Sequence, residues 1–113
     1  MKKILFIEDD PMVLKVLQSR LAREGVAIVV AVDPDEGIRK VKTEHPDLVV
    51  LDIIIKGKSG LDVLSAIRRD IKGGESLPVM VFTIDDRKET RSKAEELGVE
   101  DYFLKGMTSL QEV

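Results

Sequence analysis

Short strand-like runs alternate with helix-like segments along almost the whole chain, and this alternation limits the fold more than any other feature. Four of the runs cover residues 3–7, 48–51, 79–82 and 101–104, and a fifth strand is expected over 26–32. Short apolar runs between helical segments are typical of parallel strands that are buried on both faces of a sheet. The sequence therefore predicts an α/β protein.

Two of the expected helices begin with the same dipeptide, Asp10-Pro11 and Asp33-Pro34. Asp is a favoured N-cap, and Pro fits the first helical position. The pattern predicts helices over residues 11–24, from 34 to just before His45, after residue 60, over 85–97 and, in short form, over 107–113. The helix at 85–97 has no strongly apolar residue between Asp86 and Lys93, so we expect it to be loosely packed. We interpret residues 1–113 as one domain of five βα units.

Composition excludes several classes of protein. The 113 residues are 43% apolar and 35% charged, with a net charge of −3, which gives no general reason to bind nucleic acid or an acidic membrane. No apolar run approaches the roughly 18 residues of a membrane span. The chain has no cysteine, and His45 is its one histidine, so a disulfide, a Ser/His triad and a zinc cluster all lack their residues. A cytoplasmic location is the plain expectation.

Each of the four runs named first leads into polar residues that suit phosphoryl chemistry. Residues 8–10 are Glu-Asp-Asp, and Asp52, Thr83 and Lys105 follow the other three runs. Taken singly, these residues have ordinary explanations as helix caps, turn residues, backbone-bonded hydroxyls or solvated lysines. In a parallel sheet, however, ligands bind beyond the carboxyl ends of the strands. Because carboxylates ~5 Å apart repel by about 3 kcal/mol at an effective dielectric near 20, a shared site there needs a cation or Lys105.

With this set of residues, nearly the whole chain resembles the receiver domains of two-component response regulators. The resemblance implies a flavodoxin-like (βα)5 fold, with a five-stranded parallel sheet of order 2-1-3-4-5 and helices on both faces. It also implies Mg²⁺ as cofactor and Asp52 as the phospho-accepting nucleophile. The site residues that it implies are Asp9, Asp10, Asp52 and the carbonyl of Ile54 for the metal, Thr83 and Lys105 for catalysis, Thr83 and Tyr102 for the switch, and Gly60 to close the loop after Asp52.

Partners and output follow from the same resemblance. A sensor histidine kinase or a phosphotransfer protein would donate the phosphoryl group, and a downstream effector domain or protein would read the result. The face formed by the fourth helix, the fifth strand and the last helix would change when phosphorylation draws Thr83 away and lets Tyr102 turn inward. The resemblance allows a phosphorylation-dependent dimer and implies no direct binding of nucleic acid or membrane. Such a domain is not an enzyme for a metabolite, because it catalyses only its own phosphorylation and dephosphorylation.

The chain departs from the family pattern at four positions. Lys56 stands where proline is usual, so we expect a looser loop after Asp52. Gly106 stands where the family commonly has proline in a cis peptide, and we expect a trans bond there because a cis bond before glycine costs ~2.5–4 kcal/mol. Ile84 is bulkier than the usual small residue and is expected to crowd the phosphoryl pocket. Ile54 lacks a polar group that would orient a hydrolytic water, which predicts slow self-dephosphorylation.

Two other functions remain open from the sequence. Ile84 and Gly106 leave room for a degenerate receiver that acts only as a protein-interaction module. A haloacid-dehalogenase-type phosphatase also uses a strand-end aspartate, Mg²⁺ and a lysine, but its nucleophile normally lies in an Asp-x-Asp motif after the first strand. Here Asp9-Asp10 leads straight into Pro11, and no cap domain is present.

Overall fold

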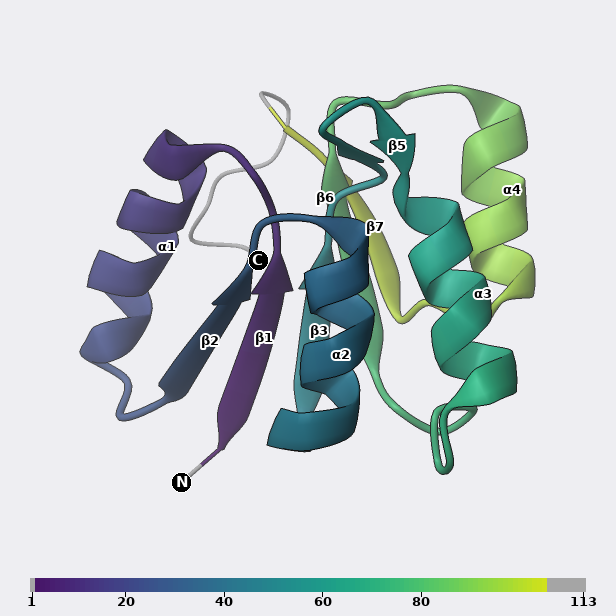
Figure 1. The fold of residues 1–113 in the computed structure, drawn as a ribbon. Coiled ribbons are helices and arrows are strands. Elements are labelled where there is room, and N and C mark those ends of the chain that lie inside the picture. The colour runs from purple at the N-terminus through teal and green to yellow at the C-terminus, as the bar shows by residue number, and fades with distance from the viewer. Residues whose placement is uncertain (1, 106–113) are drawn as a thin grey trace.

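A five-stranded parallel sheet forms the centre of the computed structural model, which describes residues 2–105 (Figure 1). Its strands are β1 (Lys3–Ile7), β2 (Ala27–Ala31), β3 (Leu48–Leu51), β6 (Val79–Thr83) and β7 (Asp101–Leu104). They lie in the order β2-β1-β3-β6-β7. Counted among these five strands alone, this is the order 2-1-3-4-5, so the predicted flavodoxin-like topology is confirmed. The short helix expected over 107–113 and the residue Gly106 lie outside the described part of the chain.

The first two helices of the structure begin where the sequence predicted, the third begins within one residue of its predicted start, and the fourth begins later than predicted. They are α1 (Pro11–Ala22), α2 (Pro34–Glu44), α3 (Gly60–Asp70) and α4 (Lys88–Glu96). Asp10 caps α1 by accepting a hydrogen bond from the Met12 N–H at 3.0 Å, and Asp33 caps α2 in the same way. Both caps satisfy backbone donors that have no partner within the first turn of a helix.

The helix α4 is shorter than expected and buries little. It begins at Lys88 because the Asp85 carboxylate accepts hydrogen bonds from the backbone N–H and the guanidinium of Arg87, whose backbone is extended. Only Thr90 and Ala94 of α4 are buried. The prediction of a loosely packed helix is consistent with this burial, since few apolar contacts hold α4 against the sheet.

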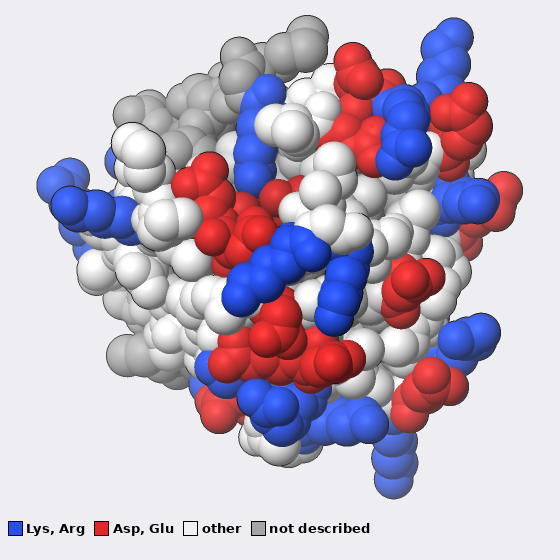
Figure 2. All heavy atoms as spheres, turned by 45° about the horizontal axis from the view of Figure 1, so that its top comes forward, with Lys and Arg blue, Asp and Glu red and all other residues white. Residues whose placement is uncertain are grey.

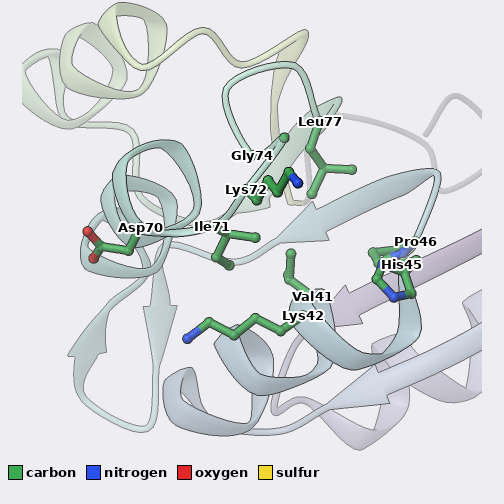
Figure 3. Close-up of a pocket in the computed structure, with 10 residues that line it drawn as sticks. Val41, Lys42, His45, Pro46, Asp70, Ile71, Lys72, Gly74 and Leu77 are labelled. Carbon is green, nitrogen blue, oxygen red and sulfur yellow. The ribbon is translucent and has the colours of Figure 1, made fainter.

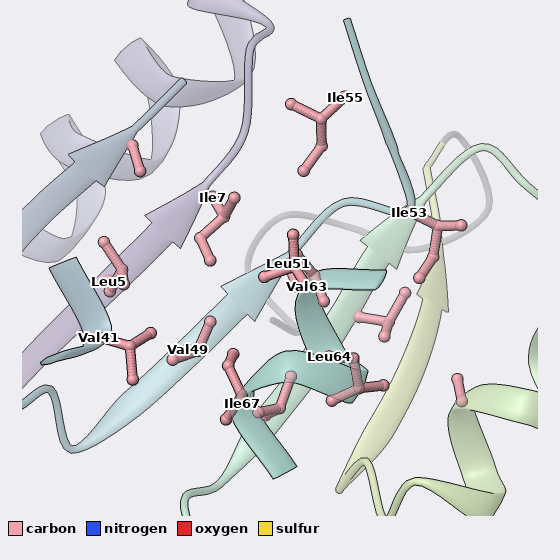
Figure 4. Close-up of a cluster of buried hydrophobic side chains, with 14 of the residues drawn as sticks. Leu5, Ile7, Val41, Val49, Leu51, Ile53, Ile55, Val63, Leu64 and Ile67 are labelled. Carbon is pink, nitrogen blue, oxygen red and sulfur yellow. The ribbon is translucent and has the colours of Figure 1, made fainter. Parts of the chain in front are cut away.

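Apolar side chains cover both faces of the sheet, because alternate residues of a strand point to opposite sides. Leu5 and Ile7 of β1 belong to the larger cluster, which α2, α3 and α4 cover (Figure 4). Phe6 belongs to a second cluster, where it packs with Leu17 of α1. The central strands β1, β3 and β6 are therefore largely buried on both faces, with helices on each face as the sequence predicted, whereas the edge strands β2 and β7 are mostly half-buried.

Residues 54–59 form a small antiparallel hairpin instead of the loose loop that was expected. Its strands are β4 (Ile54–Ile55) and β5 (Lys58–Ser59). The two turn residues, Lys56 and Gly57, have φ values of 50° and 75°. Positive φ at both central residues is the requirement of a type I′ turn, which suits a two-residue hairpin.

Candidate functional site

The register of the two central strands determines where the first carboxylates lie. Ile7 of β1 pairs with Leu51 of β3, so the next residues, Glu8 and Asp52, leave the sheet at the same level. Glu8 donates its backbone N–H to the Ala31 carbonyl at 2.9 Å, and Asp52 donates to the Ile7 carbonyl at 3.0 Å. Both residues thus extend their strands by one position, and both are buried.

Three carboxylates meet at this carboxyl end of the sheet. One oxygen from each of Glu8, Asp9 and Asp52 lies within 4.8 Å of the other two. Figure 2, in which the top of Figure 1 comes forward, shows acidic side chains gathered near the middle of the face, with basic side chains beside them. The structure therefore brings Asp9 and Asp52 together, as predicted.

The expectation that Asp10 joins this cluster is corrected by the structure, which places Glu8 there instead. Asp10 is exposed, and its carboxylate is engaged at the start of α1, where it accepts hydrogen bonds from the N–H groups of Met12 and Val13. The sequence held a signal for Glu8: it is the first residue after its strand, as Asp52 is after β3.

Lys105 joins two of the carboxylates. It follows β7, and its backbone N–H is bound to the Thr83 carbonyl at 2.8 Å. Its Nζ lies 2.9 Å from Asp52 Oδ2 and 2.9 Å from Glu8 Oε2. The side chains of all three residues are largely buried, with 15% exposure for Lys105 and 5% for each carboxylate. Lys105 thus lies where the sequence predicted and balances part of the negative charge.

The protonation equilibria of Glu8 and Lys105 reflect this arrangement. Burial alone lowers the pKa of Lys105, but hydrogen bonds to Asp52 and Glu8 outweigh it and raise the pKa above its ordinary value. The pKa of Glu8 is also raised, first by burial and further by the charge of Asp52, although Lys105 acts in the opposite direction. Both pKa values are raised, but for different reasons. Lys105 gains two carboxylate partners, whereas Glu8 is buried and shares one ammonium with a second carboxylate.

Asp52 is held in a defined orientation. Its Oδ1 accepts the backbone N–H of Ile54 at 3.0 Å, and its Oδ2 accepts Lys105 Nζ. Gly60, which begins α3, lies against the backbone of residues 52 and 53: a Cβ there would clash with the Asp52 carbonyl and lie 2.9 Å from Ile53 Cα. A glycine is therefore required at position 60 for this close approach. The predicted role of the Ile54 carbonyl as a metal ligand stays a prediction.

Thr83 and Tyr102 are connected through one residue. Thr83 is fully buried, and its hydroxyl accepts the Asp85 N–H at 3.3 Å. The Tyr102 hydroxyl donates to the Asp85 carbonyl at 2.7 Å, so the ring is already turned inward. Burial, reinforced by the Asp85 charge, raises the pKa of Tyr102 to about 12. The connection through Asp85 had no signal in the sequence.

Ile84 lies mostly in solvent, and its expected crowding of the phosphoryl pocket stays a prediction. Its side chain is 67% exposed, while Thr83 beside it is buried. Successive residues of an extended segment point to opposite sides, so the buried hydroxyl of Thr83 places Ile84 in solvent.

A cavity of about 400 Å³ lies at the other end of the molecule (Figure 3). The carboxyl-terminal ends of α2 and α3 line it, together with the segment that leads into β6, and Val41, Pro46 and Leu77 are among its apolar residues. His45, which is exposed and directly follows α2, also lines the cavity. Because this cavity adjoins the amino ends of β3 and β6, it is separate from the acidic cluster.

The donor set of the acidic cluster fits a hard divalent cation. Glu8, Asp9 and Asp52 offer oxygen ligands only, and Mg²⁺ takes oxygen ligands, typically one or two carboxylates besides water and phosphate. No helix of the described residues is long and apolar enough to cross a membrane. Fold and site together define a flavodoxin-like α/β protein with an acidic site and a lysine at the carboxyl ends of its strands.

Comparison with known proteins identifies the family. The family model described as the response regulator receiver domain matches residues 4–112, so the chain belongs to this family. The receiver domain of Klebsiella pneumoniae RstA, solved in its BeF3-activated form, is 32% identical, with a TM-score of 0.83 over 98% of this chain and 91% of that one.

Two relatives are named as transcriptional regulatory proteins and are longer than this chain. The chain is 33% identical over 104 residues to the alkaline phosphatase synthesis transcriptional regulatory protein PhoP of Bacillus subtilis, covering 92% of this chain and 42% of PhoP. It is 34% identical over 110 residues to the probable transcriptional regulatory protein TcrX of Mycobacterium tuberculosis, covering 97% of this chain and 45% of TcrX. The chain thus spans less than half of the length of these relatives.

Proposed function

We propose that this receiver domain accepts a phosphoryl group on Asp52 from a phosphohistidine in a Mg²⁺-dependent reaction. One observation carries the proposal: Glu8, Asp9 and Asp52 converge within 4.8 Å, and Lys105 binds two of these carboxylates. An isolated group of three carboxylates would destabilise the fold. Such a group is expected where a cation and a phosphoryl group are to be bound.

Asp52 is the nucleophile in this proposal. One of its carboxylate oxygens forms a bond to phosphorus while the bond from phosphorus to the histidine nitrogen breaks, and the electron pair stays on that nitrogen. The N–H of Ile54 and the ammonium of Lys105 hold the Asp52 carboxylate in one orientation before the reaction. Lys105 also lies close enough to offset negative charge on the phosphoryl oxygens.

Mg²⁺ fits the same group of oxygens. Glu8, Asp9 and Asp52 would hold it, directly or through water, with the Ile54 carbonyl as the further ligand that the family resemblance implies. When bound, the ion neutralises charge on the transferred phosphoryl group. Asp10 is not needed in this set, because it caps α1.

The output of the domain would pass through Thr83, Asp85 and Tyr102. The Thr83 hydroxyl is bound to the Asp85 N–H, and the Asp85 carbonyl is bound to Tyr102. If the Thr83 hydroxyl turns to a phosphoryl oxygen on Asp52, the Asp85 N–H loses its acceptor and the segment before α4 can shift. Since α4 buries few residues, a small free-energy difference is enough to move it.

The partners belong to the same proposal. A histidine kinase or a phosphotransfer protein in the cytoplasm would supply the phosphoryl group, and an effector domain, an effector protein or a second copy of the chain would bind the altered face. In this proposal the domain transforms no metabolite and makes no direct contact with nucleic acid. The names of PhoP and TcrX point to transcriptional regulation, and more than half of each of those proteins lies outside the part that this chain matches.

Intact-mass measurement tests the proposal. The protein is incubated with a small phosphodonor, with Mg²⁺ or with EDTA, and an Asp52→Asn variant is treated in parallel. A lasting phosphoryl adduct on the unmodified protein, dependent on Mg²⁺ and absent from the variant, supports a receiver. Consumption of the donor without an adduct supports the phosphatase alternative, and no reaction supports the degenerate receiver; either result overturns the proposal.

A further inference from the structure

The turn between β4 and β5 carries a backbone conformation that side chains rarely adopt. Lys56 has a φ of 50°, and it is not a glycine. A non-glycine residue in the left-handed region persists where its surroundings hold it there, and such residues are frequent at functional sites. The conformation of Lys56 therefore calls for a local reason.

The reason lies in a hydrogen bond between the hairpin turn and the segment that follows β1. The backbone N–H of Lys56 donates to Asp9 Oδ2 at 2.9 Å, although the two residues are 47 positions apart. Within residues 2–105 no other hydrogen bond to the Asp9 carboxylate is found. The other two carboxylates of the cluster, Glu8 and Asp52, are held by Lys105 instead.

We propose that Lys56 is a positioning residue of the cation site, where its backbone N–H fixes the Asp9 carboxylate for a divalent ion. This inference rests on the proposed function, because it takes Asp9 as a ligand. A carboxylate has two oxygens with several lone pairs, so an N–H on Oδ2 leaves oxygen lone pairs available to the ion. Carboxylates that bind metals are commonly oriented by such outer partners.

The left-handed conformation of Lys56 is part of the arrangement that directs its N–H to Asp9. It belongs to the type I′ turn of Lys56 and Gly57, which closes the hairpin directly after the Asp52 segment. The hairpin thus joins the segment that follows Asp52 to Asp9 at the end of β1. The charge of the Lys56 side chain has no part in this, because the donor is a backbone group.

An amide-to-ester replacement tests the donor without changing the side chain. Lysine at position 56 is replaced by its α-hydroxy acid, which converts the N–H to an ester oxygen. The same replacement at Gly57, with glycolic acid, controls for an ester within the turn. A Lys56→Gly variant removes the side chain, keeps the N–H and tolerates the positive φ, so it serves as the control for the side chain.

The readout is the dissociation constant for Mg²⁺, measured by calorimetry without any phosphodonor, beside the urea unfolding curve in EDTA. We expect the ester at position 56 to weaken Mg²⁺ binding by about 10- to 100-fold, the range found when an outer partner of a metal ligand is removed. The Gly57 ester and Lys56→Gly should bind Mg²⁺ as the unmodified protein does.

Three results would overturn the inference, and they are distinguishable from failure of the proposed function. Unchanged Mg²⁺ affinity in the Lys56 ester shows that the N–H does not position Asp9, and equal weakening in the Gly57 ester shows a general effect of the ester. Weakening in Lys56→Gly assigns the effect to the side chain. If the unmodified protein itself binds no Mg²⁺, the metal site of the proposed function fails first, and this inference fails with it.

Discussion

Replacing Lys105 by methionine should destabilise the fold by exposing the repulsion within the acidic cluster. The change keeps most of the apolar stem and removes the ammonium that lies 2.9 Å from both Glu8 and Asp52. Removing one partner of a buried ion pair costs about 3–5 kcal/mol, because the other charge remains buried without compensation. Since Lys105 keeps 15% exposure, we expect the lower end of that range, about 3 kcal/mol.

Mg²⁺ should restore part of this loss. A cation bound among Glu8, Asp9 and Asp52 supplies positive charge where the ammonium was removed. A ligand at 100 times its dissociation constant stabilises the state that binds it by about 2.7 kcal/mol. Without the competing ammonium, the cluster in Lys105→Met should bind Mg²⁺ more tightly than the cluster in the unmodified protein. At saturating Mg²⁺, each tenfold difference in affinity narrows the gap in unfolding free energy by about 1.4 kcal/mol relative to EDTA.

Urea unfolding followed by circular dichroism measures both effects. Lys15→Met, at an exposed position of α1, is the control for the loss of one lysine and should change stability little. The double variant Lys105→Met with Glu8→Gln removes one of the two carboxylates that lose their partner, so it should be more stable in EDTA than Lys105→Met alone. If Lys105→Met costs no more than Lys15→Met, or if Mg²⁺ leaves the gap unchanged, the charge-balance account is refuted.

Three further measurements test other parts of the structure. Gly60→Ala should lower the free energy of unfolding by about 1–3 kcal/mol in urea titrations, because the new Cβ meets backbone that cannot move freely; an unchanged midpoint would contradict the close approach. Tyr102 is the one tyrosine and the chain has no tryptophan, so near-ultraviolet absorbance should report an ionisation midpoint of about 12. Because this pKa is raised, its contribution to stability is present below pH 10.0 and is lost as the pH rises through about 12; a midpoint near 10.0 in the folded protein would place the ring in solvent. Arg87 lowers the pKa of Asp85, so that contribution is present above pH 3.8 and is lost as the pH falls through the lower folded pKa. Arg87→Gln should flatten this loss in acid unfolding curves, and an unaltered curve would count against the pair.

The fold could be predicted from local signals because they agree with one another. Asp-Pro pairs cap α1 and α2, and apolar runs mark strands that are buried on both faces. Lys105 could be predicted as well, since it directly follows a strand whose carboxyl end lies beside that of β6. These features depend on short stretches of sequence and on the common direction of the strands.

Other parts of the site depend on geometry that a sequence does not carry. Glu8 had a signal, since it directly follows its strand, but Asp10 is withdrawn from the cluster because its carboxylate caps α1, and whether an Asp caps a helix or joins a site depends on how the chain turns after β1. The hairpin turn at Lys56 has no sequence signal, because Lys is not a residue that favours positive φ. The link from Thr83 to Tyr102 passes through backbone atoms of Asp85, and backbone atoms are the same in every residue.

Locating the phosphorylated residue tests the central claim most directly. After reaction with a phosphodonor and Mg²⁺, borohydride reduces an aspartyl phosphate to homoserine, and tandem mass spectrometry of the peptides then identifies the converted position. The account predicts homoserine at position 52 and unmodified aspartate at positions 9 and 10. Conversion at Asp9, or no conversion at any aspartate, would contradict it.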